Sequence, residues 1–270
     1  MIDFKKYGNP EIVNDIADVM SSPQRATIGI AKWGLFFAVL GFIVDVVFIY
    51  SLKQPIYAAI PSSVFVFFAM FFSGALFGLY LFFMDLNRSF KTILGYTNCV
   101  VHLAVNDICD SFDTLKLGID GCRIKLPGGH EVVGGVLNDV INPAAKKCLE
   151  SKIPWVGKFV SKAYSLVVNW LLKVSSVFFA RVDKEIDKAV TARLGKLKGV
   201  ADAPLNFVEN TVKRIWLSKV SDGVDRYIGK AQGCIRKAYV LISVPILTFA
   251  VAFAAVAYAG AVIILVVFAG

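Results

Sequence analysis

The chain has 270 residues, of which 57% are hydrophobic, and its mean hydropathy is +0.65. Ordinary soluble domains are about half apolar, so this composition excludes a simple soluble globular protein. The net charge of +9 comes from one region, since residues 146–237 hold 19 basic and 8 acidic residues, a balance of +11. Such a region attracts anionic lipid, acidic proteins or nucleic acid.

Residues 1–32 form an N-terminal segment with balanced charge, which we expect on the cytoplasmic side. Within it, residues 10–20 place apolar side chains at helical spacing after Pro10, a favourable first residue of a helix. This pattern predicts a short amphipathic helix, either on the membrane surface or packed as a cap on the rest of the protein. We expect the helix to end before Pro23, because proline disfavours helical geometry in the residue that precedes it.

Residues 33–84 predict a transmembrane hairpin. Trp33–Leu52 and Ala58–Met84 are each long enough to cross the bilayer core as a helix, and the connection between them is short and contains Pro55. Basic residues flank the outer ends of the two spans, whereas the connection holds only Lys53. The positive-inside rule therefore places the N-terminus and residues 85–237 in the cytoplasm, with the protein in the inner or plasma membrane.

Asp45 lies near the middle of the first span. An ionisable group at that depth is costly and suggests an ion path, a proton relay or an interhelical pair. A protonated Asp45, or one hydrogen-bonded to serines of a neighbouring helix, would instead be structural. The sequence leaves both interpretations open.

Small residues recur four positions apart in the predicted spans. The pairs are Gly34 with Ala38, Gly74 with Gly78, Ala250 with Ala254, and Ala257 with Ala261. Such spacing lets two helix backbones approach closely, and it predicts helix packing either within the chain or between chains.

Residues 85–150 predict a cytoplasmic segment of mixed α and β structure. A helix is expected near residues 91–117. After it, two extended stretches flank Pro127-Gly128-Gly129, which predicts a small β-hairpin near residues 122–133. A lone hairpin is marginally stable, so it would need a helix or another subunit to pack against.

Residues 151–237 predict a basic region of amphipathic helices. Between residues 155 and 180 the polar side chains follow one narrow helical stripe, formed by Lys158, Lys162, Ser165, Asn169, Lys173 and Ser176. The helix would lie in the membrane interface, pack in a bundle, or cross the bilayer with the stripe along a water-filled path. In the last case Lys158, Lys162, Asn169 and Lys173 join Asp45 as ion-path candidates.

Residues 238–270 contain no charged side chain and predict a single C-terminal transmembrane helix. The expected fold is thus an all-α integral membrane protein with an N-terminal transmembrane helical hairpin, a cytoplasmic amphipathic-helix region that includes a small β-hairpin, and a C-terminal transmembrane helix.

No nucleotide-binding, metalloprotease or serine-hydrolase motif is present, and the five cysteines form no CxxC pair, so we expect no catalytic residues, metal or cofactor. We expect a non-enzymatic structural or channel-forming subunit of an oligomeric membrane complex. Its partners would be anionic lipids and either further copies of itself or other membrane subunits. The alternatives are a transporter or ion-conducting pore that uses Asp45, and a membrane component of a secretion or DNA-transfer apparatus, with nucleic acid contact resting on charge alone.

Overall fold

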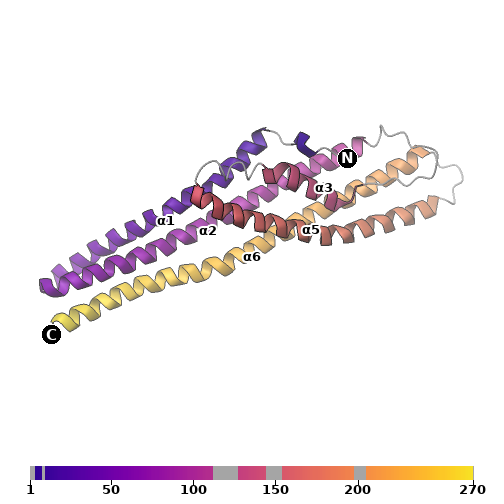
Figure 1. Ribbon diagram of the computed structural model, residues 1–270. Helices are drawn as coiled ribbons and strands as arrows, with labels where there is room; N and C mark the ends of the chain where they lie inside the picture. Colours follow the sequence, from indigo (N-terminus) through magenta and orange to yellow (C-terminus); the bar gives the residue numbers. More distant parts are fainter. Residues whose placement is uncertain (1–3, 8–9, 112–126, 144–153, 198–204, 270) are drawn as a thin grey trace. The chain divides into compact units, whose positions relative to one another are not determined.

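The computed structural model describes residues 4–7, 10–111, 127–143, 154–197 and 205–269. Every element in these ranges is helical, which confirms the all-α expectation. In chain order the elements are the 3-10 helix η1 (Phe4–Tyr7), α1 (Pro10–Ser51), α2 (Ile56–Ser111), α3 (Gly129–Val136), the π-helical turn η2 (Leu137–Ile141), α5 (Pro154–Leu197) and α6 (Leu205–Ala269) (Figure 1).

The chain divides into two compact units. One unit, here called the basic unit, comprises Met1–Met20 and Phe90–Cys234. The other, the apolar unit, comprises Ser21–Ser89 and Ile235–Gly270. Helices α1, α2 and α6 each contribute to both.

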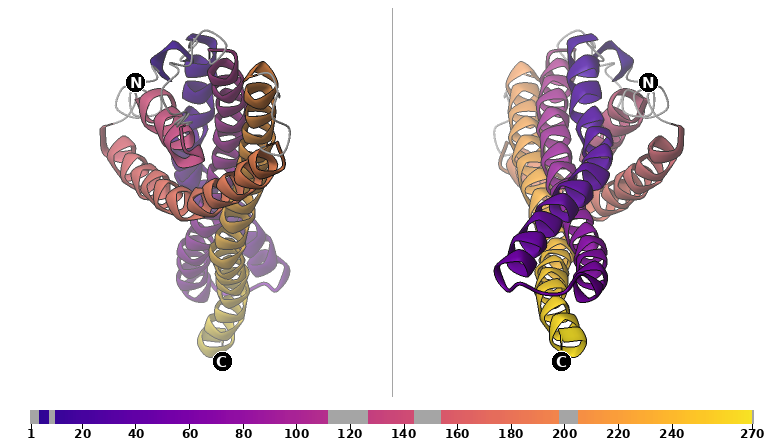
Figure 2. Two further views of the ribbon diagram at one scale, coloured as in Figure 1. Left: turned by 90° about the vertical axis from the view of Figure 1, so that its right-hand side faces the viewer. Right: turned by 90° about the vertical axis from the view of Figure 1, so that its left-hand side faces the viewer.

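The apolar unit consists of the later part of α1, the earlier part of α2 and the later part of α6, which run side by side (Figure 1). The loop between α1 and α2 and the C-terminal end of α6 lie at the same end of this unit (Figure 2). Helix α1 ends at Ser51 and α2 begins at Ile56, so the predicted antiparallel hairpin is confirmed. Lys53, in the loop, has a left-handed backbone with φ of 51°.

Among the described residues, four helices are long and apolar enough to cross a bilayer, which is typical of a membrane protein. The four segments are Ile28–Ser51, Ile56–Asp110, Ser165–Ala192 and Asn210–Phe268. Helices α2 and α6 have 56 and 65 residues, about 84 and 98 Å at the usual helical rise, whereas the hydrocarbon core is about 30 Å thick. Each of these two helices is therefore much longer than a single crossing requires.

The β-hairpin predicted near residues 122–133 is wrong. Residues 122–126 lie outside the described residues, and the second expected strand falls inside α3, which is helical from Gly129. Gly128 is extended and precedes the first turn, where its N–H donates to Glu131 Oε2 at 3.3 Å and the N–H of Gly129 donates to Asp183 Oδ1 at 3.1 Å. Two N–H groups at the helix start thus find carboxylate partners, and Pro-Gly-Gly begins a helix instead of turning a hairpin.

The break expected before Pro23 is also wrong, since α1 continues through residues 21–23. Proline disfavours a helical residue before it but does not forbid one, and a long helix can continue past it. The single C-terminal helix is confirmed, and it is the end of α6, which also includes Pro245.

The basic unit is built around contacts of α3 with α5 and with η1. Its buried apolar residues include Val132, Val133, Val136, Leu137, Phe179, Trp216, Val220 and Val224. Two buried aromatic groups that carry a polar atom are hydrogen-bonded: Tyr227 OH donates to the Leu171 carbonyl at 2.6 Å and Trp216 Nε1 to the Pro127 carbonyl at 3.3 Å. Helix α5 is curved along its length (Figure 2).

Candidate functional site

Asp45 is buried in the apolar unit, with 2% of its surface exposed, and both of its carboxylate oxygens accept hydrogen bonds. Ser62 Oγ donates to Oδ1 at 3.1 Å, and Ser63 Oγ donates to Oδ2 at 2.7 Å. The two serines lie early in α2, directly after the loop that folds α2 back along α1. The geometry therefore corresponds to the structural interpretation, in which serines of the neighbouring helix satisfy the carboxyl group.

The glycines of the predicted small-residue pairs lie where α1 and α2 are in close contact. A Cβ atom added at Gly34 would lie 3.2 Å from the Phe71 carbonyl oxygen, and one added at Gly74 would lie 3.0 Å from Gly34 Cα. At Gly78 the added Cβ would lie 2.6 Å from Ile30 Cα. These positions leave no room for a side chain, and Ala38 beside them is fully buried.

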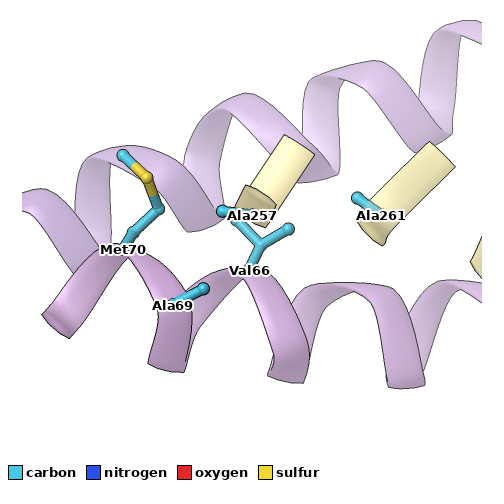
Figure 3. Close-up of a cluster of buried hydrophobic side chains, with 5 residues drawn as sticks. All are labelled: Val66, Ala69, Met70, Ala257 and Ala261. Atoms are coloured by element: carbon cyan, nitrogen blue, oxygen red, sulfur yellow. The ribbon is translucent and has the colours of Figure 1, made fainter. Parts of the chain in front are cut away.

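The alanines of α6 pack on α2 in the same unit. Ala257 and Ala261 face a cluster formed by Val66, Ala69 and Met70, as Figure 3 shows. Ala254 lies at the edge of this cluster, and the Ala250 carbonyl accepts a hydrogen bond from Ser73 Oγ at 2.8 Å.

Two further glycines take part in this packing and were not singled out in the sequence. A Cβ added at Gly41 would lie 2.6 Å from Met70 Cγ, and one added at Gly260 would overlap the Phe65 ring. Neither glycine has a small residue four positions away, so the four-residue spacing gave no signal for either.

The polar stripe of α5 lies in the basic unit. The side chains of Lys162, Asn169 and Lys173 are exposed, while the side chain of Lys158 lies outside the described residues. Asp45 belongs to the apolar unit, so the proposed ion-path residues are not gathered within one unit.

Helix α5 has one packed face and one exposed apolar strip. Val168, Leu171 and Phe179 are buried on the packed face. The strip is formed by Leu166, Trp170 and Val177, which are 70%, 43% and 61% exposed. Large apolar side chains at helical spacing with such exposure need a cover other than water. The sequence did not separate the two faces, because both read as apolar.

Carboxylates of the basic unit are held by contacts between its helices. His102 Nε2 lies 3.0 Å from Asp225 Oδ1, and Asn98 Nδ2 donates to the same oxygen at 3.0 Å. These two contacts, the histidine first, hold the pKa of Asp225 below its usual value. Lys6 Nζ and Tyr7 OH contact Asp107 in the same way, each at 3.0 Å, and lower the pKa of that carboxyl group.

The second histidine is also beside an aspartate, with His130 Nδ1 3.6 Å from Asp183 Oδ2. Among the described residues no group of three histidine, cysteine or acidic side chains is arranged to hold a metal ion. The polar contacts described above join helices to one another. Comparison with known proteins yields no match, either to a family model or, at a significant level, to a curated protein or a solved structure.

Proposed function

We propose that this protein is a non-enzymatic structural subunit of a membrane complex. It uses its basic unit to bind the anionic cytoplasmic surface of the bilayer. The observation that carries the proposal is the exposed apolar strip of α5, formed by Leu166, Trp170 and Val177, with the exposed Lys162 and Lys173 on the same helix. An apolar strip bordered by lysines is typical of a helix that lies in the membrane interface.

The magnitudes support surface binding of a unit that is already tethered. Burial of one large apolar side chain contributes about 1.5–3 kcal/mol, and each lysine near an anionic leaflet contributes about 1 kcal/mol. The strip and its two lysines therefore supply several kcal/mol. This is sufficient for contact with lipid, because the chain is anchored by its own spans and pays little further cost for association.

Lying on the surface accounts for α5 better than crossing the bilayer does. Lys173 falls inside the apolar stretch of α5, and a lysine at the bilayer centre costs about 2.5–3.5 kcal/mol on insertion scales. One face of α5 is already occupied by the Leu171 and Phe179 contacts within the basic unit. A helix that lies in the interface satisfies both conditions, since its lysines reach water and its opposite face remains packed.

Photolabelling tests the proposal on the intact chain. The protein is reconstituted in nanodiscs of phosphatidylcholine, with or without about a third of phosphatidylglycerol, together with a trace of phospholipid that carries a diazirine. We expect mass spectrometry to find label on the peptide that contains Leu166–Val177, more of it in the anionic discs, and less at high salt because salt screens the attraction.

The matched variant is Trp170→Ser with Val177→Ser, which removes apolar area and leaves the charge unchanged. We expect it to lose the label on this peptide while label on the span that contains Val47 stays constant. Absence of label from 166–177 in both kinds of disc would contradict the proposal. DNA binding with steep salt dependence in place of lipid labelling would instead favour the DNA-transfer alternative.

Self-association is a separate part of the proposal. The predicted small-residue pairs pack within the chain, so contact between copies would use exposed apolar faces such as the one that includes Leu35, Val39 and Ile43. The mass of the detergent-extracted complex measures this directly. A multiple of the chain mass, 29.5 kDa, supports an oligomer, and a single chain mass refutes it.

A further inference from the structure

A pocket of about 190 Å³ lies between α5 and α6 in the basic unit. Its lining residues are Phe178, Arg181, Val182 and Glu185 from α5, and Lys219, Gly223, Arg226 and Lys230 from α6. Successive residues within each set are one, three or four positions apart, so each helix contributes one face.

The floor of the pocket is apolar. Gly223 is buried, and a Cβ added there would lie 3.2 Å from Val182 Cγ1, so this glycine lets the two helices approach closely. The Phe178 ring lies beside them, with Lys230 Nζ at 5.0 Å from its centre. This cation–π contact holds one ammonium group at the pocket.

The remaining lining is mainly cationic. Arg181, Lys219, Arg226 and Lys230 bring four positive charges, against the single negative charge of Glu185. Within the part of the chain that the structure describes, none of the four cations forms an ion pair with a carboxylate, although Lys6 elsewhere in the unit does. Like charges held in one pocket repel, so an anion that enters relieves repulsion as well as forming new contacts.

We propose that this pocket binds a phosphate monoester group, carried either by a lipid headgroup or by a small soluble phosphate ester. A phosphate monoester has a charge of about −1.5 to −2 at neutral pH and three acceptor oxygens. Arginine matches it with two parallel N–H donors, and the pocket offers this group twice, in Arg181 and Arg226. The lipid source rests on the proposed function, because it requires the basic unit to reach the membrane surface.

The volume limits what enters. The cavity volume of about 190 Å³ is smaller than that of pockets for whole drug-sized ligands, which measure about 300–1,000 Å³. A phosphate group with the first atoms attached to it fits, and the remainder of a lipid or soluble ester would extend outward. The carboxylate of Glu185 provides an acceptor for a hydroxyl group next to the phosphate, such as the one in a glycerol phosphate.

Calorimetry on the full chain in phosphatidylcholine nanodiscs tests the pocket, with glycerol 3-phosphate as the soluble probe. The pocket variant is Arg181→Gln with Arg226→Gln. The control is Lys188→Gln with Arg214→Gln, which removes the same charge from exposed positions outside the pocket. We expect the pocket variant to bind the probe at least about tenfold more weakly, and the control to bind within about threefold of the unmodified chain.

Arg181→Lys with Arg226→Lys separates geometry from charge. It keeps all four cations and loses the paired N–H donors, so we expect an intermediate affinity. Circular dichroism and the thermal midpoint of each variant establish that the helices remain folded.

A second set of nanodiscs distinguishes the two sources of phosphate. Phosphatidic acid carries a phosphate monoester, whereas phosphatidylglycerol is a diester. If the lipid occupies the pocket, phosphatidic acid in the disc weakens binding of glycerol 3-phosphate and phosphatidylglycerol does not. If the ligand is soluble, the affinity for glycerol 3-phosphate is the same in both discs.

Equal loss of affinity in the pocket and control variants would overturn the pocket, as would failure of the unmodified chain to bind the probe or binding of DNA alone. In these cases the proposed membrane contact still stands if α5 is photolabelled. Conversely, probe binding without labelling of α5 would retain the pocket as a site for a soluble ester and reject the proposed function.

Discussion

Asp45 shows how a charged residue type is accommodated in an apolar span. The two serines that bond it were visible in the sequence, but only the antiparallel return of α2 brings Ser62 and Ser63 to the height of Asp45. The sequence thus left two roles open for Asp45, because it does not show which residues face its carboxyl group.

Replacement of Asp45 tests its structural role. Asp45→Leu leaves the buried Ser62 hydroxyl without its partner, which we expect to lower the free energy of unfolding by about 1–3 kcal/mol. Asp45→Asn keeps an acceptor oxygen and should cost less. Thermal unfolding in detergent measures both, with the exposed Thr248→Val as control. If Asp45→Asn abolishes ion flux in vesicles while unfolding is unchanged, the transport alternative is correct instead.

The same substitution at two glycines of α2 should have opposite effects. Gly78→Ala places a methyl group only 2.6 Å from Ile30 Cα, and we expect this overpacking to destabilise the protein by about 1–3 kcal/mol. Gly95→Ala meets nothing within 4 Å and should stabilise the helix by about 0.5–1 kcal/mol. The two thermal midpoints, measured in one detergent, check this. Equal shifts would mean that α1 and α2 are not in close contact at Gly78.

At the scale of elements, the error near residues 122–133 has a definite origin. Pro-Gly-Gly is typical of a turn, but the apolar residues that follow it are spaced as in a helix. Those residues are Val132, Val133, Val136, Leu137, Val140 and Ile141, all buried, and their repeat of one and three residues is helical. The information needed to predict α3 was therefore in the sequence. Its contacts with α5 were not, because α5 is distant in the chain.

We expect the contact between α2 and α6 at Asp225 to depend on pH. Because the folded pKa of Asp225 is depressed by His102 and Asn98, its stabilising contribution is fully present above the unfolded value near 4 and is lost as pH falls through the folded value. We expect Asp225→Asn to make the acid limb of a plot of thermal midpoint against pH shallower. Asp222→Asn, at an exposed neighbouring position, is the control and should leave the acid limb unchanged. Identical curves for the two variants would contradict the role of Asp225.

At the scale of the whole molecule, hydropathy predicted the long apolar helices, whose length and composition are those that a bilayer imposes on any helix that crosses it. It did not predict that α2 and α6 continue past residues 84 and 237 as single helices. A change from apolar to charged residues marks a change from lipid to water around the helix. The helix itself ends only where its pattern of backbone hydrogen bonds stops. The pocket between α5 and α6 could not be predicted from the sequence, because its cations come from two separate helices.

We propose that the apolar unit crosses the membrane, with the loop between α1 and α2 exposed on one aqueous side and the lysines of α5 exposed on the other. An amine reagent that cannot cross membranes tests this on sealed vesicles of known orientation, with labelled lysines located by mass spectrometry. Lys53 is in the loop, and Lys188 is exposed on α5. We predict that the two are labelled from opposite sides, and that each reacts from the other side only after permeabilisation. Labelling of both from the same side of intact vesicles would contradict the account.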